Sequence, residues 1–207
     1  MMTGSNIHIL TNNIMPIYPS KHFPESKTAH KYLDNLRGIE IGGGAHNGWG
    51  LNILNVDYCD PPNGNGSDDV VGEFLPVHVV APGDDLPFKD KTFDFVISSH
   101  VLEHFFDPIG TMKEWSRVAT QYIVMIMPHK DRCNDRDRPV TTIRELWDRH
   151  TGKVKQSSVG GSDVDDHHNV WTTQAFQQLC DFLNYDVVEC LDVDDKVGNG
   201  FMVVIKL

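Results

Sequence analysis

Short apolar runs, separated by glycine, asparagine and charged residues, dominate the pattern of this chain. Each predicted strand spans between four and seven residues, which is too short for an amphipathic helix and typical of a buried strand. The pattern predicts strands over residues 38–41, 53–58, 77–80, 93–98, 122–127, 185–191 and 201–207.

Helical spacing and helix start signals lie between these runs. Residues 26–36 carry apolar side chains at helical spacing. Asp107 followed by Pro108 predicts an N-cap with proline in the first turn, and Thr142 opens a capping-box pattern. Thr173 predicts the N-cap of a further helix. Strands that alternate with helices indicate a parallel α/β sheet with right-handed crossovers.

The two ends of the chain depart from this alternation. Residues 199–200 read as a turn, which predicts that the last two strands form an antiparallel hairpin. Residues 1–24 predict an irregular arm, and residues 25–207 a single domain. Residues 151–169 are rich in Gly, Ser, Asp and His without apolar periodicity, so we expect an active-site loop over the strand ends.

Composition narrows the class of protein. The 207 residues are long enough to bury a core without disulfides, and their net charge of −11 argues against a nucleic-acid partner. The longest apolar run has six residues, so we expect no membrane span and no signal peptide. Four scattered cysteines fit reduced thiols in the cytoplasm. The oligomeric state stays open.

A glycine-rich turn follows the first predicted strand. Gly42, Gly43 and Gly44 leave room for close approach of a ligand, and the carboxyl edge of an open α/β sheet is where ligands bind. Asp57 ends the second strand, where a carboxylate can accept both hydroxyls of a ribose. The third glycine of a dinucleotide fingerprint is replaced by Asn47, so a nicotinamide cofactor is disfavoured.

Four blocks in this order resemble the class I S-adenosylmethionine-dependent methyltransferases of the type 11 group. They are EIGGG at 40–44, Asp57, LPFKDKTFDFV at 86–96 and SHVLEHFFDP at 99–108. The resemblance implies S-adenosylmethionine as cofactor. It also implies a Rossmann-like, seven-stranded, mostly parallel sheet with helices on both faces and a C-terminal antiparallel hairpin.

The resemblance also implies roles for individual residues at the cofactor. The methionine portion would contact Gly42, Gly43 and Gly44, with Glu40 orienting it, and Asp57 would hold the ribose. Further contacts are implied for the adenine, from Tyr58, Asp84, Asp85 and Leu86, and for the sulfonium side, from Ser98, Ser99 and His100. Two positions depart from the family pattern, because His46 replaces a glycine and Pro82 replaces the acid that accepts from the adenine amino group.

Three histidines are candidates for the base that an acceptor hydroxyl or protonated amine needs. They are His104 after the fourth strand, His129 after the fifth with Asp131 to orient it, and His167 in the predicted loop. Each also has a structural reading, as a residue that ties down a loop or lies in a solvated charged segment.

A metal site is disfavoured in the predicted loop. Asp163, Asp166, His167 and His168 offer ligands, but adjacent histidines in an extended chain point in different directions. Acceptor hydrogen bonding or a pH-sensitive loop cap is the preferred interpretation.

The sequence thus predicts an enzyme that transfers a methyl group to an oxygen or nitrogen of a small molecule, with a sugar or glycan precursor as the first guess. The alternative is a non-catalytic S-adenosylmethionine-binding scaffold or sensor with the same fold. Neither nucleic acid nor membrane is an expected partner.

Overall fold

The computed structural model describes residues 23–43, 48–58, 76–156 and 167–207. Its elements, in chain order, are α1 (Lys27–Leu33), β1 (Arg37–Ile41), β2 (Asn52–Asp57), β3 (Val79–Val80), β4 (Phe93–Ser99), the 3-10 turn η1 (Leu102–His104), α3 (Pro108–Val118), β5 (Ala119–Pro128), η2 (Lys130–Arg132), α4 (Ile143–His150), α5 (Thr173–Phe182), β6 (Asp186–Leu191) and β7 (Gly200–Lys206). Among the described residues, no helix is both long and apolar enough to cross a membrane.

The strands form one seven-stranded sheet in the order β3-β2-β1-β4-β5-β7-β6. The first five strands pair in parallel, and β7 runs antiparallel to both β5 and β6. The predicted mixed sheet is therefore confirmed. The direction of the strand order reverses between β1 and β4, so the turns that follow these two strands run to opposite sides of the sheet. The crevice between them is where open α/β sheets bind ligands.

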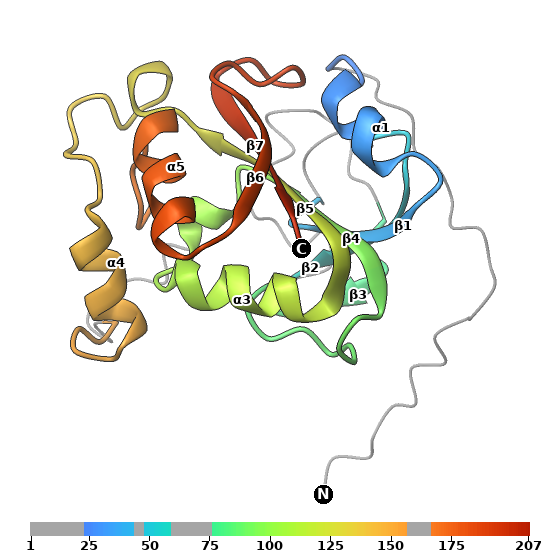
Figure 1. Cartoon of the computed structure of the whole chain (residues 1–207), viewed down its shortest axis with the longest axis horizontal. Helices are drawn as coiled ribbons and strands as arrows, with labels where there is room; N and C mark the ends of the chain where they lie inside the picture. The colour runs from blue at the N-terminus through green and yellow to red at the C-terminus, as the bar shows by residue number, and fades with distance from the viewer. Residues whose placement is uncertain (1–22, 44–47, 59–75, 157–166) are drawn as a thin grey trace, which may run out of the picture.

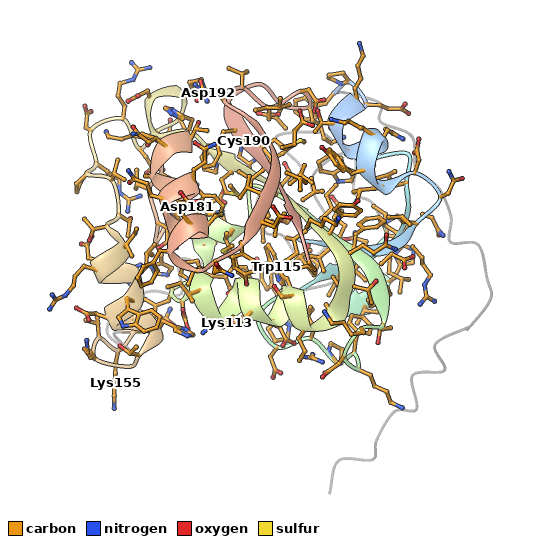
Figure 2. The ribbon with its side chains drawn as sticks, in the orientation of Figure 1. Lys113, Trp115, Lys155, Asp181, Cys190 and Asp192 are labelled. Carbon is orange, nitrogen blue, oxygen red and sulfur yellow. The ribbon has the colours of Figure 1, made fainter. Side chains whose placement is uncertain are left out.

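Apolar side chains fill both faces of the sheet. One core cluster joins the strands to α3 and α5, and the other joins the opposite face to α1. Figure 1 shows α1 on one side of the sheet and α3 on the other. In α3, Trp115 lies on the sheet side and is fully buried, whereas Lys113 is exposed (Figure 2). Helices on both faces were expected, and they are present.

Helix starts follow the capping signals with one exception. The Asp107 side chain accepts from Gly110 N, and Thr142 forms a complete capping box. The predicted cap at Thr173 is wrong, because the preceding Thr172 accepts from the backbone N–H of Ala175. The hydroxyl of Thr173 hydrogen-bonds the carboxylate of Asp192 instead.

The connection between β6 and β7 is longer than the predicted turn at residues 199–200. Its shape comes from the buried carboxylate of Asp194, which accepts from the backbone N–H groups of Lys196, Val197, Gly198 and Gly200. Four amides on one side chain hold the loop in a compact fold, which two-residue turn signals do not predict. The loop reaches the ligand edge of the sheet.

β3 is also shorter than predicted, with two residues instead of four. His78 donates its backbone N–H to Asn55 O, but the ring Nδ1 of His78 accepts the backbone N–H of Asn55. A side-chain nitrogen thus replaces the carbonyl that would extend the ladder toward residue 77.

Candidate functional site

The glycine turn after β1 packs directly beneath the segment that follows β4. Gly42 has a positive φ of 71°, and a Cβ there would lie 2.5 Å from Cγ2 of Val101. Only glycine fits both the conformation and the space. The end of β1 is therefore in contact with the start of the 101–104 segment, which joins the predicted cofactor side to the predicted acceptor side.

Glu40 lies inside the fold under this turn. Its Oε1 accepts from Trp49 Nε1 at 2.7 Å, and a Cβ on Gly43 would come within 2.4 Å of its Cδ. Lys196, only 2% exposed, sits over the Trp49 ring and donates to Gly48 O at 3.1 Å. Burial raises the pKa of Glu40 to about 7, while the Trp49 hydrogen bond and the charge of Lys196 oppose that rise.

Asp57 is buried at the carboxyl end of β2. Its Oδ1 accepts the backbone N–H of Tyr58 at 2.7 Å, and its backbone carbonyl accepts from Ala81 N. The Tyr58 side chain is 48% exposed at the same edge. A carboxylate and an exposed aromatic ring thus stand side by side at the sheet edge.

The segment predicted to flank adenine divides into two parts. Leu86 belongs to the core, where its backbone N–H donates to Glu114 and its carbonyl accepts from Arg117 of α3. Asp84 and Asp85 are exposed. Of the three residues predicted to contact the adenine, the side chain of Leu86 therefore faces the core, and those of Asp84 and Asp85 face the surface.

The end of β4 brings three predicted residues to the same edge. Ser98 pairs in register with Ile41, and its buried hydroxyl has no hydrogen-bond partner within the described ranges. Ser99 Oγ lies 3.1 Å from His100 Nδ1, and the other ring nitrogen of His100 contacts Asn199 Oδ1 at 2.9 Å. Burial lowers the pKa of His100.

Beyond the glycine turn, the side chains of Glu103, His104 and His167 converge; we call them the acceptor-side cluster. Glu103 Oε1 lies 3.7 Å from His104 Nε2 and 3.9 Å from His167 Nε2. The two imidazole rings are nearly perpendicular, with centroids 5.0 Å apart. Burial raises the pKa of Glu103 to about 8, and the charge of Asp135 adds to the rise.

The position of His167 is fixed by neighbours from two loops. Its Nδ1 lies 2.5 Å from Asp135 Oδ2, and Arg138 donates both to Asp135 Oδ1 and to the backbone carbonyl of His167. The backbone N–H groups of His168 and Asn169 donate to Glu103 O. The end of the predicted active-site loop is thus anchored onto the 101–104 segment.

Other histidines are not part of the cluster. His129 accepts the backbone N–H of Asp131 and packs edge-on against Phe201, and burial lowers its pKa. His168 turns its ring toward Phe106, away from its neighbour His167. The divergence expected of these adjacent histidines is present, and His104 and His167 are the two candidate bases that lie together.

Several predicted features lie outside the described residues. They include Gly44, His46, Asp163, Asp166, residues 1–22 of the arm and residues 157–166 of the loop.

Sequence reasoning missed three contributors to this region: Asp135, Arg138 and Lys196. The first two stand in a run of mixed charges that resembles a solvated loop, and Lys196 stands in a polar turn. The one usable signal was the spacing of the charges in that run, since Arg138 follows Asp135 by three residues.

Comparison with known proteins agrees with this geometry. Residues 41–122 match the family model described as "Methyltransferase domain", a segment that runs from the glycine turn through β4 and α3. Residues 41–122 of the chain thus form a methyltransferase domain, and the fold around them is that of the class I, S-adenosylmethionine-dependent kind. Accordingly, S-adenosylmethionine is its cofactor and it is an enzyme. No curated protein matches the sequence of this methyltransferase.

Solved structures share the fold of this methyltransferase at low sequence identity. An S-adenosylmethionine-dependent methyltransferase from Mesorhizobium loti is 13% identical, with a TM-score of 0.50 over 85% of this chain and 93% of that one. One from Methanosarcina mazei is 14% identical, with a TM-score of 0.50 over 87% and 96%. These likenesses concern the fold.

The chemistry of the site fits the cofactor. The buried Ser98 hydroxyl is without a partner in the part of the chain that the structure describes, and it lies beside the glycine turn. Asp57 is a buried carboxylate at the carboxyl end of β2, the edge where a ribose would sit. A buried hydroxyl and a buried carboxylate at one edge of the sheet are groups that the amino-acid part and the sugar part of such a cofactor would need.

Proposed function

We propose that this methyltransferase transfers the methyl group of S-adenosylmethionine to an oxygen or nitrogen of a small molecule, with a sugar hydroxyl as the first acceptor to test. One observation carries the proposal: the contact between Gly42 and Val101. It joins the edge that would hold the cofactor to the acceptor-side cluster, so the two reactants would meet within a few residues of Val101.

Each part of the cofactor has residues suited to hold it. Gly42 and Gly43 leave space for the methionine portion, Ser98 offers a hydroxyl, and Asp57 offers a carboxylate to the ribose. The bound cofactor supplies an electrophilic methyl group on a sulfonium. The task left to the chain is to align the acceptor with that methyl group and to exclude water.

The acceptor-side cluster supports removal of a proton from the acceptor. An oxygen that enters over the cluster meets the carboxylate of Glu103 and the Nε2 atoms of His104 and His167, groups that can accept a hydrogen bond or a proton. Asp135 fixes His167 through Nδ1, which leaves Nε2 directed at the cluster. In this proposal Asp135 and Arg138 are positioning residues.

The net charge and the free thiols support two further parts of the proposal, an acceptor other than nucleic acid and a location in the cytoplasm. A net charge of −11 disfavours a nucleic-acid acceptor. Cys133, Cys180 and Cys190 are free thiols, which suits the reducing cytoplasm.

Calorimetric titration of the full chain with S-adenosylmethionine and S-adenosylhomocysteine tests the first half of the proposal. We expect micromolar binding in the wild type and at least about tenfold weaker binding in Asp57→Ala. The matched control Asp186→Ala removes an exposed carboxylate from β6, at the other end of the sheet, and should bind as the wild type does. Failure of the wild type to bind either ligand would overturn the proposal.

An acceptor screen tests the second half. Transfer of a labelled methyl group would be followed by scintillation, beginning with nucleotide sugars and continuing with small amines. Incorporation into protein or RNA, with none into small molecules, would contradict the proposed substrate class.

A further inference from the structure

The acceptor-side cluster brings three potential metal ligands close together. One ligand atom each from Glu103, His104 and His167 lies within 4.8 Å of the other two. The atoms come from η1 and from the end of the predicted loop, so the fold rather than local sequence brings them together. Modest closure of these distances would give the ligand spacing of a single bound ion.

The carboxylate at the centre of the cluster is the strongest observation. Glu103 is fully buried, and neither of its oxygens has a hydrogen-bond donor among the described residues. A buried carboxylate without partners is costly, so a native protein seldom retains one without a compensating group. The negative charge of Asp135 further disfavours the ionised form of Glu103. A bound cation would offset this repulsion.

The outer contacts of His167 prepare its ring to bind a metal rather than to donate a hydrogen bond. In the neutral ring whose proton is on Nδ1, that N–H donates a hydrogen bond to Asp135 Oδ2 at 2.5 Å, so Nε2 carries a lone pair. That lone pair faces Glu103 Oε1 at 3.9 Å, which places one acceptor opposite another. A carboxylate on the far nitrogen of a ligating histidine is the usual outer-shell arrangement of metal sites.

The access to the cluster matches a site with an open position. The side chain of Glu103 is fully buried on the inner side of the cluster, whereas the side chains of His104 and His167 are 27% and 24% exposed. Two imidazoles and one carboxylate with one open side are the ligand set of catalytic zinc sites. Magnesium and calcium prefer oxygen ligands and do not suit two imidazole nitrogens.

We propose that Glu103, His104 and His167 bind one divalent transition-metal ion, with zinc favoured, and leave one coordination position open toward the acceptor. The binding site stands on the geometry of the cluster alone. Its use rests on the proposed function: with the metal on the two imidazole nitrogens, an acceptor hydroxyl in the open position would lose its proton to water rather than to the histidines, because the metal lowers its pKa.

Cobalt titration of the chelator-treated full chain tests the site without any assay of activity. Co²⁺ should give visible absorption bands that saturate at one ion per chain, and Zn²⁺ should remove them by displacement. Glu103→Gln and His167→Gln should each weaken Co²⁺ binding by about 100-fold or more, and Asp135→Asn by about 10- to 100-fold. The control His30→Gln alters a histidine of α1 outside the cluster and should bind as the wild type does.

Two results would overturn the proposal: absence of Co²⁺ and Zn²⁺ binding by the wild type at micromolar concentration, or unchanged binding in both Glu103→Gln and His167→Gln. Circular dichroism of each variant checks that it is folded. Titration of the same samples with S-adenosylmethionine separates the two proposals. Cofactor binding without metal binding would discard the metal site alone, and metal binding without cofactor binding would discard the methyl-transfer proposal alone.

Discussion

Two glutamates are buried near the carboxyl ends of neighbouring strands, and their surroundings differ sharply. Glu40, near the end of β1, accepts a hydrogen bond from Trp49 at 2.7 Å and feels the positive charge of Lys196. Glu103, four residues after β4, has no hydrogen-bond donor to either carboxylate oxygen in the described ranges. The negative charge of Asp135 raises its pKa further. Burial raises the pKa of both carboxyls.

The difference indicates that Glu40 has a structural role, whereas Glu103 is placed to bind a group from outside the chain. The environment of Glu40 compensates part of its desolvation, because Oε1 is hydrogen-bonded, although Oε2 is buried beside Gly43 without a donor among the described residues. The environment of Glu103 compensates less of it, through a contribution from its own backbone, and adds two histidines at 3.7 and 3.9 Å. A native protein tolerates the second arrangement where binding, not folding, supplies the missing partner.

The largest expected effect comes from removing the partly compensated carboxylate. Glu40→Leu should lower the free energy of unfolding by about 2–4 kcal/mol, because it leaves the Trp49 N–H without an acceptor and Lys196 without nearby negative charge. Urea unfolding followed by tryptophan fluorescence measures this change.

Two further variants sharpen that result. Glu40→Gln keeps an acceptor for Trp49 and should lose less stability than Glu40→Leu. Adding Lys196→Met to Glu40→Leu removes the uncompensated cation and should restore part of the loss. A neutral Glu40→Leu substitution would mean that the two glutamates do not differ in the way described.

The pH dependence of stability provides the next largest effect. The pKa of Glu40 is about 7 in the folded protein, above the ordinary value of 4.5 expected when unfolded. The folded state therefore binds the proton more tightly, so this contribution to stability is fully present below pH 4.5 and is lost as pH rises through 7. The loss is at most about 3 kcal/mol.

The comparison of wild type with Glu40→Gln isolates this titration from all others. Stability of the variant relative to the wild type should rise between about pH 5 and about pH 8, as measured by urea unfolding at both values. A difference that is constant with pH would show that the carboxyl does not titrate in this window.

Sequence patterns predicted the fold better than they predicted the boundaries. The apolar runs identified all seven strands of the described sheet because buried strands must be apolar on both faces. The β6–β7 connection was missed because Asp194 shapes it through four backbone amides, and no turn motif encodes that. The cap at Thr172 was missed because two adjacent threonines offer the same signal.

The site was predictable only where it is local in sequence. The glycine turn and Asp57 each end a strand, so pattern and topology place them at one edge of the sheet. The link of His167 to Glu103 and Asp135 joins residues 64 and 32 positions apart, and nothing in the sequence marks such pairs. His129 illustrates the same limit, because its position after β5 does not bring it into the cluster.

The third prediction has the opposite sign from the first. Glu103→Leu should raise the free energy of unfolding of the metal-free protein by about 1–3 kcal/mol at about pH 9, because it replaces an uncompensated buried carboxylate with an apolar group of similar volume. Methyl transfer should fall at the same time. Chemical unfolding of the variant and the wild type, both after chelator treatment, measures the change in stability. A loss of stability would mean that Glu103 has a structural role like that of Glu40.

The smallest effect concerns the single hydrogen bond that distinguishes the two carboxylates. Trp49→Phe keeps an aromatic ring but removes the indole N–H, so Oε1 of Glu40 loses its donor and resembles the oxygens of Glu103. We expect a loss of about 1–2 kcal/mol and a further rise in the pKa of Glu40, because that hydrogen bond favours the charged form. In the background of Glu40→Leu, Trp49→Phe removes an indole N–H that already lacks its acceptor, so it should cause no further loss and restore part of the stability. An equal loss in both backgrounds would assign the contribution of Trp49 to packing in the core rather than to Glu40, and the contrast between the two glutamates would then rest on Lys196 alone.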